Sequence, residues 1–403
     1  MSRAHWAAAI LAATSLVLTA ACAPGGGNGG GGGGGGSGGP IKIGVIADLT
    51  GATGDVGTPY NKGMLGYVKW INSKGGIDGR KIDATSKDYA YDVPTAERLY
   101  KEYVNDGVVA IQGWGTGDTE ALVKKVAADE LPFMSASYAE ALTDPKEAPY
   151  NFVIAPTYSD QMYVALNWID KEAGGGDTQV AFFHNDSPFG LAPLEDGQNW
   201  IQQKNLALTM KPYAMPSGSA NYVGLLSQAE KQGAKYIIIQ NVSSPAAQVA
   251  KDIKAQGLDM KIVCLNWCAD ELFVDGAGDA SEGHVLIQPF APATANQPGN
   301  KEVEQFLKSE GSSLEKEGLH YTQGWYTMAV MAEGIRAALK DGGDLSGTSI
   351  KDALETMGAV DTGGVVGTGE VKFSKESHGG STGTGIYVAK DGKMEPLEEG
   401  VTP

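Results

Sequence analysis

From residue 41 onward, short apolar runs rich in β-branched residues alternate with helical patterns. Residues 41–47 (IKIGVIA) form an apolar run that predicts a buried strand. In residues 94–107 the apolar side chains recur at i, i+3, i+4, i+7 and i+8, which predicts a helix with one buried stripe. Pro94 suits the first turn of that helix and Gly107 suits its C-terminal cap. Residues 108–111 follow as the next predicted strand.

The same order of elements recurs further along the chain. An apolar stripe over residues 222–229 predicts a helix that ends at Gly233, and residues 236–240 (YIIIQ) form the next strand. A second helix is predicted from Ser244 to Gly257, followed by a strand over residues 261–265. A repeated helix, glycine and buried strand is typical of βαβ units around a parallel sheet.

Two such sets, over residues 41–156 and 178–288, predict two α/β lobes with a cleft between them. Proline-containing links at residues 154–157 and 288–292 are the expected crossings between the lobes. Further on, we expect a long helix over residues 319–341 and short strands near 371–373 and 385–389. We assign residues 41–156 with 290–360 to lobe 1, and residues 157–289 with 361–403 to lobe 2.

The first residues have the pattern of an export signal. Arg3 precedes an apolar run over residues 7–21, which is too short for a transmembrane helix and suits a signal peptide over residues 1–21. The run ends in LTAAC (18–22), which resembles the bacterial lipobox and implies lipidation of Cys22. A plain secretory signal with an incidental cysteine is the alternative.

Glycine makes up 57 of the 403 residues, and 13 of these glycines lie within residues 25–39. Such a run behaves as flexible coil, with an end-to-end distance of roughly 20–23 Å. We therefore predict that residues 22–40 comprise a lipidated cysteine and a flexible linker. The whole domain would then be held near the outer face of the cell membrane.

The charge balance and the other cysteines narrow the function classes. A formal net charge of −17 argues against nucleic acid or an anionic membrane surface as partner. Cys264 and Cys268 would face an oxidising compartment, and their i,i+4 spacing leaves both a disulfide and two free thiols open. The histidines are scattered without the spacing of metal ligands, so we expect no metal site.

Six segments together carry a family resemblance. They are IGVIADLTGATGDVG (43–57), NSKGGIDGRKI (72–82), NDGVVAIQGWGTGDTEAL (105–122), LPFMSASYAEALT (131–143), FFHNDSPFGLAP (182–193) and LNWCADELFVDGAGDASEG (265–283). Through them the chain resembles the type I solute-binding proteins of ABC transporters, in the leucine/isoleucine/valine-binding branch. The resemblance covers residues 41–398. It implies an α/β fold of two Rossmann-like parallel-sheet lobes joined by a three-stranded hinge, that is, a type I periplasmic binding protein-like fold.

The loop over residues 113–119 (GWGTGDT) is the expected ligand site. Ligands of open parallel sheets lie beyond the carboxyl ends of strands, where helix N-termini present free N–H groups. The resemblance implies that Thr116 binds a ligand carboxylate and that Ser137 offers its backbone carbonyl to an amino group. Gly115 permits close approach of backbone to ligand, and Ser243 is expected in the same cleft. An ordinary helix N-cap is the alternative for this loop.

Several positions depart from the amino-acid binders of the family. Asn266 stands where a lobe 2 acid commonly pairs the ligand ammonium, and Ala139 stands where a threonine is familiar. Tyr91 and Gly115 replace a cysteine pair. Because an unpaired ammonium in a closed cleft is costly, these departures weigh against a standard amino acid. Candidate substitutes for the missing acid are Asp118, Asp186 and Asp270.

Aromatic residues replace the acid in the loops that are expected to face the cleft. They are Tyr91, Trp114, Tyr138, Phe189 and Trp267. Aromatic walls suit apolar or aromatic groups, and quaternary ammonium groups through cation–π attraction. Some of these rings could instead only close the lobe surfaces. Our hypothesis is a pocket that prefers a bulky hydrophobic or aromatic carboxylate, or an amide, over leucine.

The chain lacks the G-x-S-x-G, Walker A, G-x-G-x-x-G and H-E-x-x-H motifs, so we expect no enzyme, no catalytic residue and no cofactor. The resemblance implies an extracytoplasmic solute-binding lipoprotein of a branched-chain amino acid-type ABC importer. It would capture a small hydrophobic or aromatic amino acid or carboxylate by hinge closure, as a monomer, and deliver it to a membrane permease. The alternative is a sensor lipoprotein that binds an amide or aromatic acid for a signalling partner.

Overall fold

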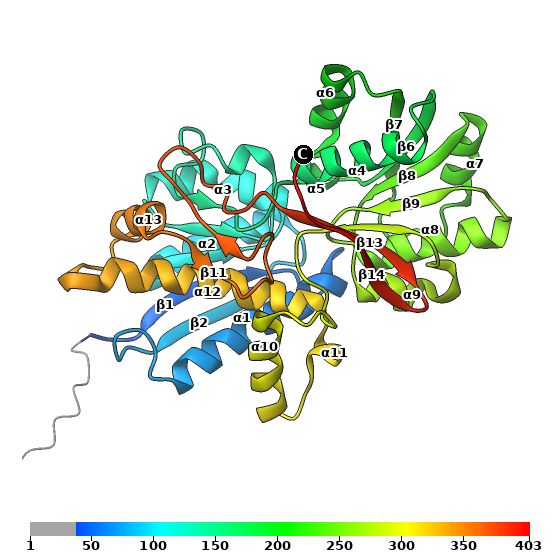
Figure 1. Ribbon diagram of the computed structural model, residues 1–403. Coiled ribbons are helices and arrows are strands. Elements are labelled where there is room, and N and C mark those ends of the chain that lie inside the picture. The colour runs from blue at the N-terminus through cyan, green and yellow to red at the C-terminus, as the bar shows by residue number, and fades with distance from the viewer. Residues whose placement is uncertain (1–37) are drawn as a thin grey trace, which may run out of the picture. The chain divides into compact units, whose positions relative to one another are not determined.

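The computed structural model describes residues 38–403 and contains two main β-sheets with helices packed on them (Figure 1). The expected signal peptide, the lipidation site at Cys22 and the linker up to residue 37 lie outside the described residues. No helix between residues 38 and 403 is both long enough and apolar enough to cross a membrane.

The first sheet has five parallel strands in the order β2-β1-β3-β4-β5. Together with the helices on it, this sheet is called lobe 1 below. Its strands and their connecting helices are β1 (Ile41–Ala47), α1 (Gly54–Ser73), β2 (Ile82–Asp88), α2 (Val93–Asp106), β3 (Ala110–Gly113), α3 (Thr116–Ala128), β4 (Phe133–Ser135) and β5 (Asn151–Phe152).

The caps of α2 follow the predicted pattern. The Asp92 side chain accepts a hydrogen bond from the Thr95 amide, and Pro94 lies in the first turn. Gly107 ends the helix with φ 71° and ψ 43°, a left-handed conformation that glycine adopts without strain. These caps direct the chain from α2 into β3.

A later part of the chain returns to lobe 1. Figure 1 shows this yellow and orange segment beside the blue N-terminal elements. It contains α10 (Pro298–Ser309), α11 (Leu314–Glu317), α12 (Leu319–Leu339), α13 (Gly347–Thr356) and the small antiparallel pair β11 (Val360–Asp361) and β12 (Glu370–Val371).

Helices α1 and α12 cross at two glycines. A Cβ atom on Gly63 would lie 1.9 Å from the Tyr321 carbonyl oxygen, and one on Gly324 would lie 1.9 Å from that of Tyr60. Such distances are far inside van der Waals contact, so the two backbones touch where neither has a side chain. The two helices therefore form one closely packed pair on lobe 1.

The second sheet, with its helices, is called lobe 2. It has seven strands in the order β14-β13-β10-β9-β8-β6-β7. Strands β6 to β10 are parallel, whereas β13 and β14 run antiparallel at one edge. Its elements are α4 (Tyr158–Glu172), β6 (Thr178–Asn185), α5 (Pro188–Leu191), α6 (Leu194–Lys204), β7 (Leu208–Met215), α7 (Val223–Lys231), β8 (Ala234–Gln240), α8 (Ser243–Gln256), β9 (Lys261–Cys264), α9 (Glu271–Ala277), β10 (Val285–Gln288), β13 (Thr384–Lys390) and β14 (Lys393–Val401).

Three chain segments connect the lobes: 153–157, 289–297 and 372–383. They pair with neighbouring backbone, because Val153 bridges Gly379 and Phe290 bridges Val366. Val371 and Phe373 pack in the same hydrophobic core as the lobe 1 strands. The chain therefore stays with lobe 1 up to about residue 373 and joins the lobe 2 sheet at β13.

Candidate functional site

A small pocket lies at the carboxyl ends of the lobe 1 strands, against residues of lobe 2. Its lining residues are Thr53, Tyr91, Trp114, Gly115, Thr116, Ala136, Tyr158, Phe189, Val242 and Trp267. None of these ten side chains carries a formal charge. The pocket volume is about 20 Å³, room for roughly one water molecule.

The N-terminus of α3 forms the polar end of this pocket. Strand β3 ends at Gly113, and the N-cap residue Gly115 makes no side-chain capping hydrogen bond. The amides of Thr116 and Gly117 donate to no side chain of the described residues and are available to an anionic ligand, whereas those of Gly115 and Asp118 act on the Asp118 carboxyl. The Thr116 hydroxyl lies 2.8 Å from the Ser137 hydroxyl, so the two side chains form one polar pair beside these amides.

Asp118 lies directly behind Gly115. A Cβ atom on Gly115 would lie 2.4 Å from Asp118 Oδ1, and that oxygen accepts a hydrogen bond of 2.9 Å from the Tyr89 hydroxyl. Burial raises the pKa of Asp118 to about 7, and the nearby Asp48 adds to the increase. Asp118 Oδ2 has no hydrogen-bond partner within the described residues. The carboxyl is thus poised between neutral and charged near physiological pH.

Tryptophans from both lobes meet in the pocket. The rings of Trp114 and Trp267 have centroids 5.0 Å apart at 61°. Trp114 Nε1 donates to Thr53 Oγ1 at 2.8 Å, and Trp267 Nε1 donates to the Tyr158 hydroxyl at 2.9 Å. These hydrogen bonds satisfy both indole N–H groups and hold the two rings in place, so the pocket has apolar walls of fixed orientation.

Behind Trp267, a buried polar network joins the lobes. The Trp267 ring is stacked with Tyr138 (5.8 Å) and with His320 of α12 (5.3 Å). His320 Nε2 lies 2.5 Å from Asp270 Oδ2, and His320 Nδ1 faces the side-chain oxygen of Gln323. Burial opposes the charged form of His320, but the hydrogen bond to Asp270 and its charge outweigh it and raise the pKa of His320.

A second contact between the lobes lies outside the pocket. Asp55, in the first turn of α1, accepts hydrogen bonds from the amide and the hydroxyl of Ser244 at the start of α8. A carboxylate at a helix N-terminus is stabilised by the free amides and the helix dipole. Lobe 1 thus supplies an acidic cap to a helix of lobe 2.

The structure brings six of the ten sequence-predicted ligand residues to the pocket wall. They are Tyr91, Trp114, Gly115, Thr116, Phe189 and Trp267. Ser137 and Tyr138 lie one layer behind, through the contacts with Thr116 and Trp267.

The remaining two predicted residues do not line the pocket. The Ser243 hydroxyl bonds to Asp270 and to the Trp267 carbonyl. Asn266 is fully buried, and its backbone amide donates to Gln161 Oε1. Neither polar atom of its side chain has a partner in the described part of the chain.

Four lining residues were missed from the sequence: Thr53, Ala136, Tyr158 and Val242. Thr53 follows β1 and Val242 follows β8, so the rule that ligands lie beyond strand ends could have identified both. Ala136 directly precedes the predicted Ser137. Tyr158 starts α4 of lobe 2, just after the first crossing, and nothing in its sequence context indicates a site.

The candidate substitutes for the missing acid do not line the pocket. Asp186 is exposed, Asp270 is engaged with His320 and Ser243, and Asp118 lies behind Gly115. Within residues 38–403 no group of three or more His, Cys, Asp or Glu residues could hold a metal ion.

Cys264 and Cys268 are both buried free thiols in the structure. The bridge that the sequence left open is therefore not formed. The Cys268 thiol donates instead to the Ile239 carbonyl of β8, 3.5 Å away.

The chain is similar to known proteins in sequence and in fold. Residues 40–393 match the family described as periplasmic binding protein. The leucine-, isoleucine-, valine-, threonine- and alanine-binding protein of Pseudomonas aeruginosa is 22% identical over 300 residues, covering 74% of this chain and 78% of that protein.

Two solved structures are similar to the chain over nearly its whole described length. One is a branched-chain amino acid ABC transporter protein from Thermus thermophilus with bound valine, with 27% identity, a TM-score of 0.86, and coverage of 90% of this chain and 97% of that chain. The other is an ABC transporter substrate-binding protein from Aeropyrum pernix, with 26% identity, a TM-score of 0.82, and coverage of 90% and 96%.

Proposed function

The chain belongs to the periplasmic binding protein family, and we propose that it is the solute-binding subunit of an ABC importer. It captures a small hydrophobic or aromatic carboxylate between its lobes by hinge closure and delivers it to a membrane permease. The similarity to a binding protein for branched-chain amino acids supports the transport role. The observation that carries the ligand class is the uncharged aromatic pocket at the N-terminus of α3.

The carboxylate is bound at one end of this pocket. The free amides of α3 and the Thr116 hydroxyl supply hydrogen bonds to an anion, and the positive end of the helix dipole adds to them. The hydrophobic group of the ligand then lies between the aromatic walls. Since the closed pocket is smaller than a leucine side chain, Trp114 and Trp267 separate to admit it, and the ligand replaces their mutual contact.

An ammonium group finds no counter-charge on this pocket wall. All ten lining residues are uncharged, and Asn266 stands where the related amino-acid binders are expected to carry an acid. Transfer of an unpaired ammonium from water into such a site costs several kcal/mol. The site therefore favours a carboxylate without an α-ammonium group over the corresponding amino acid.

Matched ligand pairs test this proposal. Calorimetric titration compares 4-methylpentanoate with leucine, and 3-phenylpropanoate with phenylalanine, because each pair differs only in the ammonium group. We expect the carboxylates to bind at least tenfold more tightly. Binding of leucine with the higher affinity contradicts the ligand class, and absence of binding by all four contradicts the carboxylate site.

Two threonine variants test where the ligand carboxylate binds. Thr116→Val removes the hydroxyl at the polar end of the pocket and is expected to weaken carboxylate binding about fivefold to tenfold. Thr209→Val, on an exposed position of β7, is the matched control and leaves the affinity unchanged. Equal affinities for the two variants contradict the placement of the carboxylate.

We also propose that the protein is anchored outside the cytoplasm through lipid on Cys22, on the sequence pattern described above. In a bacterial host, the full chain should partition into the detergent phase, whereas Cys22→Ser should remain in the aqueous phase. Detergent partition of both proteins contradicts the anchor.

A further inference from the structure

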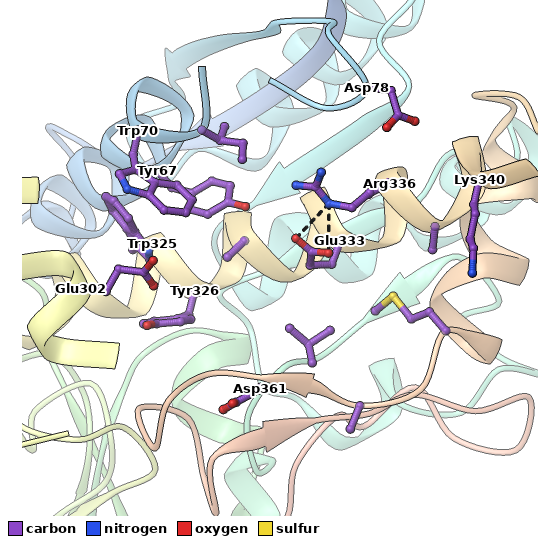
Figure 2. Close-up of a pocket in the computed structure, with 16 residues that line it drawn as sticks. Tyr67, Trp70, Asp78, Glu302, Trp325, Tyr326, Glu333, Arg336, Lys340 and Asp361 are labelled. Carbon is purple, nitrogen blue, oxygen red and sulfur yellow. Dashed lines mark hydrogen bonds and ion pairs between the residues drawn. The ribbon is translucent and has the colours of Figure 1, made fainter. Parts of the chain in front are cut away.

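A large groove lies on lobe 1, away from the pocket between the lobes. Its volume is about 690 Å³, within the range of sites for small organic molecules. Helices α1 and α12 form its floor, and α10, β11 and the segment between α13 and β11 supply its rim (Figure 2). None of its lining residues lines the pocket that binds the proposed carboxylate.

The floor of the groove is a cluster of aromatic rings. The ring centroid of Tyr67 lies 5.5 Å from that of Trp70 and 5.4 Å from that of Trp325. The ring centroids of the two tryptophans are 5.6 Å apart. Tyr326 is the next residue on α12 and also lines the groove. Such ring faces attract cations within about 6 Å.

Two largely buried tyrosines of the groove have hydroxyl groups without a partner among the described residues. Tyr67 and Tyr326 are 4% and 5% exposed, and neither hydroxyl makes a hydrogen bond to any described residue. Figure 2 shows the Tyr67 hydroxyl directed along the groove towards Glu333 and Arg336. Both residues line the groove, and their hydroxyl groups are not enclosed by protein atoms, so the two oxygens are available to hydrogen-bond a ligand there.

The charges around the groove favour a cation at the Tyr326 end. Glu302 and Asp361 line the groove and form no ion pair with any residue between 38 and 403. Burial raises the pKa of Tyr326, and the charges of Glu302 and Asp361 raise it further, which places both carboxylates near its hydroxyl. The two exposed acids therefore lie beside an aromatic surface without an ion-pair partner, although Asp361 Oδ1 accepts a hydrogen bond from the Gly363 amide and the charge of Lys74 acts on Glu302.

The other end of the groove does not change this preference. Arg336 is paired with Glu333 at 3.2 Å, as the dashed lines in Figure 2 show, so it is not free for an anion. Lys340 and Asp78 also line the groove, and their formal charges cancel. A bare metal ion is not supported, because no set of metal ligands exists within the described residues.

We propose that this groove binds an organic ammonium cation, with its charged head between Glu302, Asp361 and the Tyr326 ring. Carboxylate attraction and cation–π contact together hold the head, and the hydrocarbon part lies over Ala329 and Met357 towards Arg336. The tyrosine hydroxyls accept hydrogen bonds from a primary ammonium, whereas a quaternary ammonium uses the ring faces. This site is independent of the ligand in the pocket between the lobes.

Fluorine NMR on the full chain labelled with 5-fluorotryptophan tests the proposal. Trp70 and Trp325 report on the groove, whereas Trp114 and Trp267 report on the pocket between the lobes. Titration with hexylammonium and with hexyltrimethylammonium should shift the Trp70 and Trp325 signals saturably. Hexanoate, the anion of similar length, should leave them unchanged.

Charge variants make the test specific. Glu302→Gln combined with Asp361→Asn should raise the dissociation constant of both cations at least tenfold. Glu230→Gln combined with Asp177→Asn removes two exposed acids of lobe 2 and serves as the matched control. If both double variants have the same midpoint of thermal unfolding as wild type, their fold is intact.

Three results overturn the proposal. They are the absence of saturable shifts at Trp70 and Trp325, shifts confined to Trp114 and Trp267, and equal cation affinities of the two double variants. If only one of the two cations binds, the proposal stands and the preferred head group is identified.

Discussion

The carboxylate of Asp55 in lobe 1 accepts two hydrogen bonds from Ser244 in lobe 2, at 3.0 Å from the amide and 2.6 Å from the hydroxyl. Both bonds involve the same oxygen, Asp55 Oδ2. This pair links the first turn of α1 to the first turn of α8, and it exists only when the lobes are together. Asp55 therefore contributes to the free energy of the closed form without touching the pocket.

Asp55→Ala should weaken ligand binding by favouring the open form. Because the pair is partly exposed, we expect a loss of about 1 kcal/mol, which is roughly a fivefold increase in the dissociation constant. Calorimetric titration with the preferred carboxylate measures this. Asp83→Ala is the matched control, since Asp83 is exposed on β2 and has no polar partner among the described residues. A larger effect at Asp83 than at Asp55 is incompatible with this role.

Carboxylate affinity should fall as the pH rises through about 7. Burial raises the pKa of Asp118 to about 7, so its carboxyl ionises around that pH directly behind Gly115. The ionised group then repels an anion at the N-terminus of α3. Titrations with 3-phenylpropanoate between pH 5.5 and pH 8.5 measure the change, because the ligand stays ionised over this range.

Asp118→Asn should abolish that pH dependence and also change the stability profile. The native pKa lies above the unfolded value, so wild type loses stability as the pH rises from about 4 to about 7. The variant should lack this loss in urea unfolding at the two pH values. Identical profiles for the two proteins mean that another group is responsible.

The His320–Asp270 pair should produce a second pH dependence at higher pH. The native pKa of His320 is raised above its ordinary value, so the stabilisation is complete below about pH 6.5 and is lost as the pH rises through the native pKa. His320→Gln should reduce stability by roughly 3 kcal/mol at pH 6 and flatten the profile above pH 6.5. Urea unfolding at pH 6 and pH 8.5 measures both effects. An unchanged slope in the variant contradicts the assignment to His320.

Gly324→Ala should destabilise lobe 1 strongly. The added Cβ atom would lie 1.9 Å from the Tyr60 carbonyl oxygen, which forces α12 away from α1 at a cost of about 2 kcal/mol or more. Gly224→Ala, in helix α7, meets no atom within 4 Å and should instead stabilise by about 0.5–1 kcal/mol. Urea unfolding compares the variants, and a wild-type midpoint for Gly324→Ala would disprove the close crossing.

The alternating pattern of apolar runs and glycine caps was sufficient to predict most of the parallel-sheet elements. Helix α2 ends at Gly107 and helix α8 ends at Gly257, both with the left-handed conformation expected of a C-terminal glycine. The family resemblance is confirmed by the match over residues 40–393. The family could be identified because several short, glycine-rich loop segments match it together.

Strand β14 was not predicted, because its side chains are mostly exposed and include several glutamates that give no apolar alternation. The preceding turn does carry a signal. Asp391 and Gly392 have φ values of 50° and 71°, and an Asp-Gly pair with two positive φ angles is typical of a tight hairpin. That dipeptide could have indicated the antiparallel edge of the lobe 2 sheet.

The direction of side chains in the pocket loops could not be read from the sequence. Ser243 and Asn266 follow strand ends as expected, yet both are buried outside the pocket lining, while their neighbours Val242 and Trp267 line the pocket. A shift of one residue in a loop exchanges the lining residue for a buried one. Tyr158 reaches the pocket only because the first crossing brings α4 against lobe 1.

The packing of α1 against α12 has a consequence for the two sites. The groove floor is built from these two helices, and its core residues belong to the same hydrophobic cluster as the lobe 1 strands. In the proposed mechanism, hinge closure would move the lobes relative to each other and leave the groove intact, so the proposed cation would have equal affinity for the open and closed forms. A ligand without differential affinity cannot shift the equilibrium. The coupling free energy between the two sites should therefore be close to zero, and the chain would carry two cargoes without either one regulating the other.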